Sequence, residues 1–384
     1  MDQHERCGQK NAGRTLLPMA PVCCGTEAFS ALAPPRSDQR FVEKVRPGPA
    51  ADIPCVTSRL RSADRWGAVK ARLGVGRLHY AVDPGLYALG DPDAHSPVLV
   101  SANYKMSFDF LRASLPGRNA WILVLDTKGI NVWCAAGKGT FGTSELVNRI
   151  QASGLSDIVA HRTLILPQLG APGVAAHTVK QLSGFTVYYG PIRAADLGAY
   201  LDAGSKATPE MRRMTFPLRD RAVLIPIELS EALKPALIVI PVMCILSGFL
   251  GAGSFMDNLA QGGLFVILAL GLSILAGAVL TPLMLPYLPG RAFSAKGFAI
   301  GAITALLLIA AWGYDLSSWR GVLQTVSWLL MPSAIAAYLA MNYTGASTYT
   351  SLSGVKREMR WALPLEIAAA AVGMVVWIAS GFMP

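Results

Sequence analysis

The stretch WILVLDTKGINVWCAAGK, residues 121–138, decides the fold that this chain is expected to adopt. Its first five residues form an apolar run typical of a buried strand, and the residues at 127–129 predict a short turn. Asn131 then predicts the start of a helix, because its side chain can accept hydrogen bonds from the first free backbone N–H groups. A strand, a turn and a helix in this order are the repeating unit of α/β sheets.

Cys134 falls in the first turn of the predicted helix. Unpaired N–H groups and the positive end of the helix dipole favour a thiolate at that position. Lys138 follows four residues later on the same helix face and adds positive charge. Large apolar residues precede the thiol and small ones follow it, which would let a flat ligand approach closely. The alternative interpretation is a buried structural cysteine.

Short apolar strands alternate with helical segments around this stretch, which predicts a parallel sheet covered by helices on both faces. The expected strands are 98–100, 121–126, 163–166 and 185–189, and the expected helices are 59–81, 107–114, 131–152, 175–182 and 194–203. Ligands of such sheets bind outside the carboxyl ends of the strands. The loops after Asp126, Leu166 and Tyr189 are therefore expected to converge on one site.

The second part of the chain is apolar enough to cross a membrane. The whole sequence is 52% hydrophobic and 15% charged, which is unusual for a soluble protein. Apolar runs of about 20 residues, the length that a membrane span needs, occupy 235–253, 264–288, 297–314, 322–342 and 362–382. Lys and Arg concentrate in alternate loops, which predicts a multi-pass protein of the inner (cytoplasmic) membrane with its N-terminal domain in the cytoplasm.

Four regions are expected from these patterns. Residues 1–60 are rich in Pro and Gly and predict a disordered extension, without a signal-peptide h-region. Residues 61–205 form the α/β domain, 206–234 a basic interfacial linker, and 235–384 the transmembrane domain. Nine of the ten net positive charges lie in residues 1–221, which favours contact with anionic lipid or an acidic partner. No nucleic-acid-binding motif accompanies that charge.

Several familiar motifs are formally present but lack their structural context. Residues 137–142 match G-x-G-x-x-G, yet these glycines come after the start of the helix and not in the turn after the strand, where a dinucleotide site needs them. The histidines show no metal-ligand spacing, and the six cysteines include no C-x-x-C pair. Neither a zinc site nor an iron–sulfur cluster is therefore predicted.

The octapeptide NVWCAAGK at 131–138, continued by GTFGT at 139–143, resembles the cap-helix signature of the HgcA family, the membrane-anchored corrinoid proteins of microbial mercury methylation. The resemblance runs from roughly Leu86 to the C-terminus. It implies a Rossmann-like α/β corrinoid-binding domain with a cap helix, followed by an all-α five-helix transmembrane domain. The corrinoid domain of the corrinoid iron–sulfur protein large subunit is related to that family but lacks the cysteine.

The resemblance also implies a site. The cofactor would be a cobalamin-type corrinoid, and Cys134 would be the catalytic residue and the lower axial ligand of its cobalt. No D-x-H-x-x-G motif, through which many cobalamin proteins bind cobalt by histidine, is present. The expected cofactor-binding residues are Thr127, Gly129, Asn131, Val132, Trp133, Cys134, Ala135, Ala136, Gly137, Lys138, Leu166, Gln168, Gly170 and Gly190.

The activity implied is methyl transfer from a methyl-Co(III) corrinoid to Hg(II), which forms methylmercury. An electron-rich thiolate opposite the methyl group would favour its departure with the electron pair that Hg(II) accepts. The implied partners are the ferredoxin-like protein HgcB, with two 4Fe–4S clusters, as reductant, a methyl-folate-derived methyl donor, and membrane lipid.

Two other functions stay open at this point. One is a methyl-carrier corrinoid protein of the acetyl-CoA and folate one-carbon pathway, against which Cys134 and the apolar runs argue. The other is a membrane transporter or sensor with a cytoplasmic α/β domain, although no internal repeat or broken-helix pair supports transport.

Overall fold

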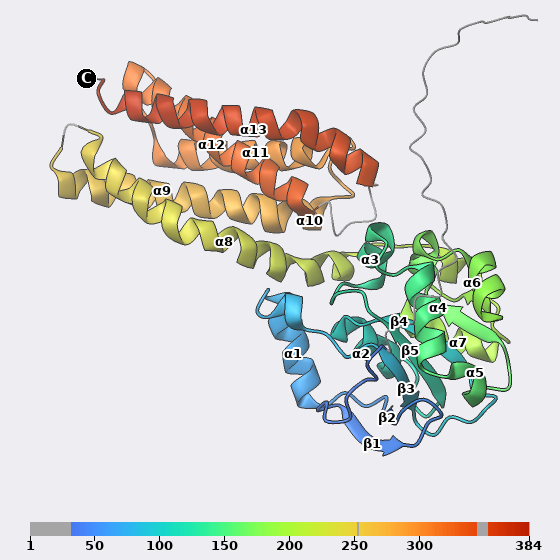
Figure 1. Ribbon diagram of the computed structural model, residues 1–384. Coiled ribbons are helices and arrows are strands. Elements are labelled where there is room, and N and C mark those ends of the chain that lie inside the picture. Colours follow the sequence, from blue (N-terminus) through green and yellow to red (C-terminus); the bar gives the residue numbers. More distant parts are fainter. Residues whose placement is uncertain (1–31, 252, 344–351, 384) are drawn as a thin grey trace, which may run out of the picture. The chain divides into compact units, whose positions relative to one another are not determined.

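The computed structural model describes residues 32–251, 253–343 and 352–383. An α/β domain is followed along the chain by a helical region, as Figure 1 shows. The strands are β1 (Val42–Arg46), β2 (Ile53–Val56), β3 (Gly85–Leu89), β4 (Val98–Ala102), β5 (Ala120–Leu125), β6 (Thr163–Leu166) and β7 (Thr186–Tyr189). They form one seven-stranded sheet in the order β1-β2-β3-β5-β4-β6-β7.

The sheet is mixed, so the expectation of a purely parallel sheet is wrong. Strands β5, β4, β6 and β7 run parallel as expected, but β3 is antiparallel to β5 and β1 is antiparallel to β2. Strand β3 was not expected, because its sequence GLYAL holds no β-branched residue. All five of its residues are nevertheless buried.

Strands β1 and β2 also correct the expectation that residues 1–60 form a disordered extension. The Pro47-Gly48-Pro49 sequence lies between two paired strands, with Arg46 opposite Ile53 across the hairpin. Every residue of β2 is buried. The sheet domain therefore begins before residue 61, and residues 1–31, including Cys23 and Cys24, lie outside the described part of the chain.

Helices cover both faces of the sheet. They are α1 (Ser62–Arg72), α2 (Lys105–Ala113), α3 (Val132–Lys138), α4 (Thr143–Ala152), α5 (Leu155–Ile158), α6 (Ala176–Ser183) and α7 (Leu197–Asp202), with short 3₁₀ turns η1 (Arg77–His79), η2 (Gln168–Gly173), η3 (Ala194–Asp196) and η4 (Glu210–Arg212). Apolar residues of α3 to α6 pack on one face of the sheet, and those of α2 and α7 on the other.

The expected helix over 131–152 is in fact two helices. Helix α3 ends at Gly139, whose φ of +83° is left-handed and favours glycine. The chain then turns so that Phe141 enters the core, where it is fully buried. Helix α4 begins only at Thr143. The cap helix is therefore a seven-residue element with its own start and stop signals.

The helical region contains, within the described residues, five helices long and apolar enough to cross a membrane. Its elements are α8 (Leu218–Phe249), α9 (Phe255–Leu275), the π-helix η5 (Ala276–Leu280), α10 (Thr281–Met284), α11 (Phe293–Trp312), α12 (Trp319–Asn342) and α13 (Leu352–Ser380). Helix α8 corrects the expected linker over 206–234, because it is continuous from residue 218. Residues 254–263, expected to be a loop, lie almost entirely in α9.

Helix α12 lies at the centre of the helical packing. Glycines on η5 and α11 meet its small residues so closely that a Cβ added at Gly277 would lie 2.7 Å from the Ala336 carbonyl oxygen. A Cβ at Gly301 would lie 2.6 Å from the Ala336 methyl group. Small residues at crossings let helix backbones approach closely, which is how membrane helices gain packing energy.

Candidate functional site

A cavity of about 360 Å³ opens at the carboxyl ends of β4 and β6, between α2 and the first turn of α3. Segments that follow three different strands reach it, namely 131–133, 166–169 and 190–194. Its walls are mainly apolar, with a few polar side chains. The lining residues are Leu99, Val100, Ser101, Ser107, Phe110, Leu111, Asn131, Val132, Trp133, Ile165, Leu166, Pro167, Leu169, Gly190, Pro191, Ile192, Arg193, Ala194 and Leu197.

The first turn of α3 forms one wall of this cavity. Asn131 caps the helix as expected, and its side-chain oxygen accepts a hydrogen bond of 3.0 Å from the backbone N–H of Cys134. Asn131, Val132 and Trp133 all line the cavity. Cys134 follows them and is half-buried, but it is not among the residues that line the cavity.

The turn before α3 is held by a residue that sequence reasoning missed. The side-chain oxygen of Asn103 accepts hydrogen bonds from the backbone N–H groups of Thr127, at 3.1 Å, and Gly129, at 2.9 Å. The Thr127 hydroxyl lies 2.8 Å from the same oxygen and 2.6 Å from the Ile130 carbonyl oxygen. Asn103 directly follows β4, and a polar residue just after a buried strand is the signal that would have found it.

Two predicted site residues, Thr127 and Gly129, belong to the turn before α3. Thr127 is fully buried and its hydroxyl is engaged within the turn, so it does not face the cavity. Gly129 has a φ of +71°, and a Cβ there would lie 3.1 Å from the Leu78 carbonyl oxygen. Both residues fix where α3 begins, which is a positioning role.

Charge around the turn is balanced by short contacts. The Asp126 carboxylate pairs with the Lys128 ammonium and accepts a hydrogen bond of 3.0 Å from the Lys128 backbone N–H. Burial acts to raise the pKa of Asp126, but these bonds from Lys128 hold it below its ordinary value. The Asp126 backbone N–H donates to Glu145, at 2.8 Å, which ties the turn to α4.

The far side of α3 is packed against η2. A Cβ at Gly173 would lie 2.1 Å from the Phe141 carbonyl oxygen and 3.0 Å from the Ala136 Cα. A Cβ at Gly170 would lie 2.6 Å from the Phe141 ring. Ala135 and Ala136 are buried here. Ala135, Ala136 and Gly170 thus pack the cap helix in place, and their role in cofactor binding stays a prediction.

The remaining predicted residues divide between the cavity and the surface. Leu166 and Gly190 line the cavity, and the Gly190 backbone N–H donates to the Leu166 carbonyl at 2.8 Å. Gly137 and Lys138 are exposed. The Gln168 side chain accepts a hydrogen bond of 2.6 Å from Arg212 and is not among the lining residues.

Helix α2 supplies the part of the cavity that sequence reasoning did not anticipate. Ser107, Phe110 and Leu111 line it, and Phe110 is 50% exposed. A half-exposed phenylalanine beside a mainly apolar cavity offers a flat surface to a ligand. Phe110 lies on a short helix after β4, and nothing in the sequence around it distinguishes it from an ordinary core residue.

The chemistry of the cavity suits a large and mainly apolar ligand. The few polar groups on its walls, such as Ser101 and Asn131, would orient such a ligand. A corrinoid is larger than this cavity, so it would extend past Trp133 and Phe110, which are both exposed. Among the described residues, no three His, Cys, Asp or Glu side chains converge as a metal site.

Comparisons with known proteins match this part of the chain. A family model described as CO dehydrogenase/acetyl-CoA synthase delta subunit matches residues 76–201. The gamma subunits of the acetyl-CoA decarbonylase/synthase complex of Methanopyrus kandleri and Methanocaldococcus jannaschii are each 32% identical, over 123 and 127 residues respectively. These matches cover 32% and 33% of this chain and 26% of each relative.

A gamma 2 subunit of the same complex in Methanosarcina thermophila is 35% identical over 99 residues, which is 25% of this chain and 21% of that protein. The chain therefore spans about a quarter of the length of the relatives that it matches. The family-model match includes the cavity, the cap helix and the turn held by Asn103, and it excludes α1 and α8 to α13. The chain is thus similar over residues 76–201 to the CO dehydrogenase/acetyl-CoA synthase delta subunit family, and over about a third of its length to gamma subunits of the acetyl-CoA decarbonylase/synthase complex.

Proposed function

We propose that this chain binds a corrinoid in the cavity beside α3 and acts in corrinoid-dependent methyl transfer. The observation that carries the proposal is the mainly apolar cavity at the carboxyl ends of β4 and β6, walled by the first turn of α3. It lies within the residues that are similar to acetyl-CoA decarbonylase/synthase subunits. The octapeptide at 131–138 supports the same cofactor.

Different residues around the cavity would contact the corrinoid, exclude water from it, and fix the position of α3. A bound corrinoid supplies a cobalt centre that accepts and releases a methyl group. The apolar walls exclude water, and Trp133 and Phe110 offer flat surfaces at the edge of the cavity. Asn131 and Asn103 fix the start of α3. Cys134, one residue beyond the cavity wall, would hold the cobalt through its thiolate.

We propose Hg(II) as the methyl acceptor. A Cys134 thiolate that held the cobalt would donate electron density to it, which would favour departure of a methyl group with its electron pair. Hg(II) is a soft ion that accepts such a carbanion equivalent, and methylmercury forms. A ferredoxin-like reductant with 4Fe–4S clusters, of the HgcB type, would return the cobalt to the state that accepts the next methyl group, from a methyl-folate-derived donor.

The membrane location is also a proposal. It rests on the five apolar helices of the helical region and on the distribution of Lys and Arg between the connecting segments, which favours a cytoplasmic α/β domain in an inner membrane. Such helices would keep the α/β domain at the membrane surface.

A second candidate function is that of a methyl carrier in acetyl-CoA metabolism, which never meets mercury. The comparisons favour it, because the relatives are named as subunits of an acetyl-CoA decarbonylase/synthase complex. In that role the methyl group leaves as a cation equivalent, and a thiolate ligand to cobalt is not required.

One experiment separates the two functions. The full chain, purified without oxygen with its cofactor, is first reduced, then methylated, and then given either Hg(II) or an acetyl-CoA synthase acceptor. The mercury function would be supported if the wild type yields methylmercury, Cys134→Ala yields none, and Cys134→His yields only a small fraction of the wild-type amount. Cys244→Ala, which removes a half-buried thiol of α8, is the control and should retain the wild-type yield. Transfer to the acetyl-CoA synthase acceptor alone would establish the second candidate.

A further inference from the structure

Helix α1 turns its large apolar side chains outward. The residues that face the domain are small or polar: Asp64 and Ala71 are buried, and Gly67 and Ala68 are half-buried. Trp66 is 63% exposed, and Val69 and Leu73 are also exposed. This is the reverse of the usual arrangement, in which the apolar stripe of a surface helix faces the core.

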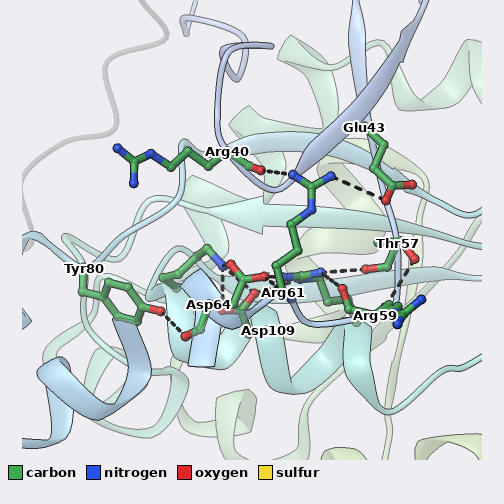
Figure 2. Close-up of polar contacts among 10 residues, drawn as sticks. Arg40, Glu43, Thr57, Arg59, Arg61, Asp64, Tyr80 and Asp109 are labelled. Atoms are coloured by element: carbon green, nitrogen blue, oxygen red, sulfur yellow. Dashed lines mark hydrogen bonds and ion pairs between the residues drawn. The ribbon is translucent and has the colours of Figure 1, made fainter. Parts of the chain in front are cut away.

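The buried face of α1 fixes this orientation. The Asp64 carboxylate accepts from the Lys105 ammonium at 2.8 Å and from the Arg112 guanidinium at 2.7 Å, and both partners are buried residues of α2. It also accepts from the Arg61 backbone N–H at 3.0 Å. Figure 2 shows Asp64 beside Arg61 and Asp109, and the Tyr80 hydroxyl, which donates to the Asp64 carbonyl at 3.2 Å.

Rotating α1 to bury Trp66 would therefore leave the two buried cations with one shared carboxylate, that of Asp109, instead of two, which is a large cost. The outward position of Trp66 is a property of the folded domain.

Exposed apolar residues continue past the end of the helix. Val75 is 61% exposed and Leu78, in η1, is 81% exposed. Together with Trp66, Val69 and Leu73, these residues make up what we name the α1 face.

The exposed charge that α1 itself supplies beside the α1 face has one sign. Arg65 and Lys70 are exposed next to its apolar side chains. Asp64 is the only acidic residue between Ser62 and His79, and it is buried and paired. A tryptophan, aliphatic side chains and cations on one surface are the composition of elements that lie in the interface of an anionic bilayer.

We propose that the α1 face binds the surface of the membrane, with Trp66 and the aliphatic residues at the level of the lipid headgroups and Arg65 and Lys70 on anionic phosphates. This rests on the proposed membrane location of α8 to α13. It adds a second contact between the chain and the bilayer, formed by the α/β domain itself, and four of its five apolar residues lie before the family-model match over residues 76–201.

The covalent connection makes such a contact intramolecular. Arg193 donates to the Thr215 hydroxyl at 2.8 Å, so the chain stays on the α/β domain up to that residue. Helix α8 begins three residues later, and its last charged residue is Lys234. Connector and charged helix together reach about 35 Å at most. Held this close, a face too weak to bind vesicles alone would still dock, because the effective concentration is high.

The test uses the full chain in vesicles of phosphatidylcholine and phosphatidylglycerol, some of whose acyl chains are brominated and quench nearby tryptophan. The difference in fluorescence between the wild type and Trp66→Phe gives the signal of Trp66. The difference between the wild type and Trp361→Phe gives the signal of Trp361 on α13. We expect Trp66 to be quenched by brominated lipid, and several-fold less in Arg65→Glu/Lys70→Glu or when the anionic lipid is left out.

The same measurement distinguishes failure of the proposed α1-face contact from failure of the proposed membrane location. Quenching at Trp361 without quenching at Trp66 would overturn this inference and leave the membrane location intact. Quenching at neither tryptophan would overturn both. Trp66 that is shielded from aqueous acrylamide but not quenched by brominated lipid would show that a second copy of the chain covers the α1 face, and the inference would again be wrong.

Discussion

Asn103 is the residue on which the geometry of the candidate site depends most. One side-chain oxygen receives the backbone N–H groups of Thr127 and Gly129 and lies beside the Thr127 hydroxyl. The Asn103 side-chain oxygen is thus the acceptor at the centre of the turn that precedes α3. Removing that acceptor would leave two backbone N–H groups, those of Thr127 and Gly129, without their partner, which is costlier than the loss of one exposed hydrogen bond.

We therefore predict that Asn103→Ala lowers the free energy of unfolding of the α/β domain by about 1–3 kcal/mol. It should also lower the cobalt retained per chain after anaerobic purification, because the start of α3 is no longer fixed. Asn148→Ala, at a half-buried position on α4, is the matched control. Equal cobalt retention in the two variants would show that the turn does not position the site.

At the same scale, the sequence predicted the cap of α3 correctly. Asn131 has one strong role, that of N-cap, and its signal is local. The functions of Thr127 and Gly170 were assigned to cofactor binding, whereas the structure buries one in a turn and packs the other against Phe141. Which way a loop residue faces depends on the elements packed around it, and a single sequence does not contain that information.

The contact between α1 and α2 is the element-scale feature with the largest energetic consequence. Asp64 and Asp109 share the buried cations Lys105 and Arg112, at distances of 2.6 to 2.8 Å. Another face of α2 lines the candidate site through Ser107, Phe110 and Leu111. The ion cluster thus ties the α1 face to the wall of the cavity.

Asp64→Ala should destabilise the protein by about 3–5 kcal/mol, because it leaves buried cations with too few partners. Asp202→Ala breaks an ion pair with Arg118 whose two side chains are partly exposed, and it should cost about 1 kcal/mol or less. Denaturant unfolding, followed by the circular dichroism of the α/β domain, measures both. Similar costs in the two variants would contradict the account of the cluster.

The cluster also predicts how stability changes with pH. Burial acts to raise the pKa of Asp64, but the Lys105 ammonium and the other hydrogen-bond donors hold it below the ordinary value of 3.8. The stabilisation is therefore fully present above pH 3.8 and is lost as the pH falls through the lower folded-state value. Unfolding measured from pH 7 down to pH 3 should show a loss that is smaller in Asp64→Asn. An identical loss in that variant would count against the assignment.

Strand prediction succeeded for β5 and β6 and failed for β1, β2 and β3. The first two are short apolar runs followed by loops, and this pattern is sufficient to find them. Strand β1 reads VEKVR, with three charged residues, and lies at the edge of the sheet. The antiparallel direction of β3 is set by its pairing with β5, and no local pattern reports pairing.

At the scale of the whole molecule, the chain joins a domain with known relatives to a helical region outside the match. Residues 76–201 carry the similarity, and α8 to α13 carry the apolar spans. The five spans were predicted from hydropathy because length and composition alone define a candidate span. The start of α8 at Leu218 was not predicted, since the helix begins with a charged segment that hydropathy excludes.

Membrane topology gives a whole-molecule prediction. With the α/β domain inside, reporters fused at Gly253 and after Pro384 should be periplasmic, and one at Arg291 cytoplasmic, because Lys and Arg concentrate in alternate connecting segments. Alkaline phosphatase and fluorescent protein fusions would measure this. A cytoplasmic C-terminus would rule out the proposed orientation.

The central claim is that a corrinoid occupies the cavity beside α3 with the Cys134 sulfur on its cobalt. Cobalt X-ray absorption of the anaerobically purified chain tests it most directly. We predict bound cobalt with a sulfur neighbour in the wild type, and bound cobalt without that neighbour in Cys134→Ala. A wild-type chain that retains no cobalt, or a cobalt–sulfur contact that persists in Cys134→Ala, would contradict it.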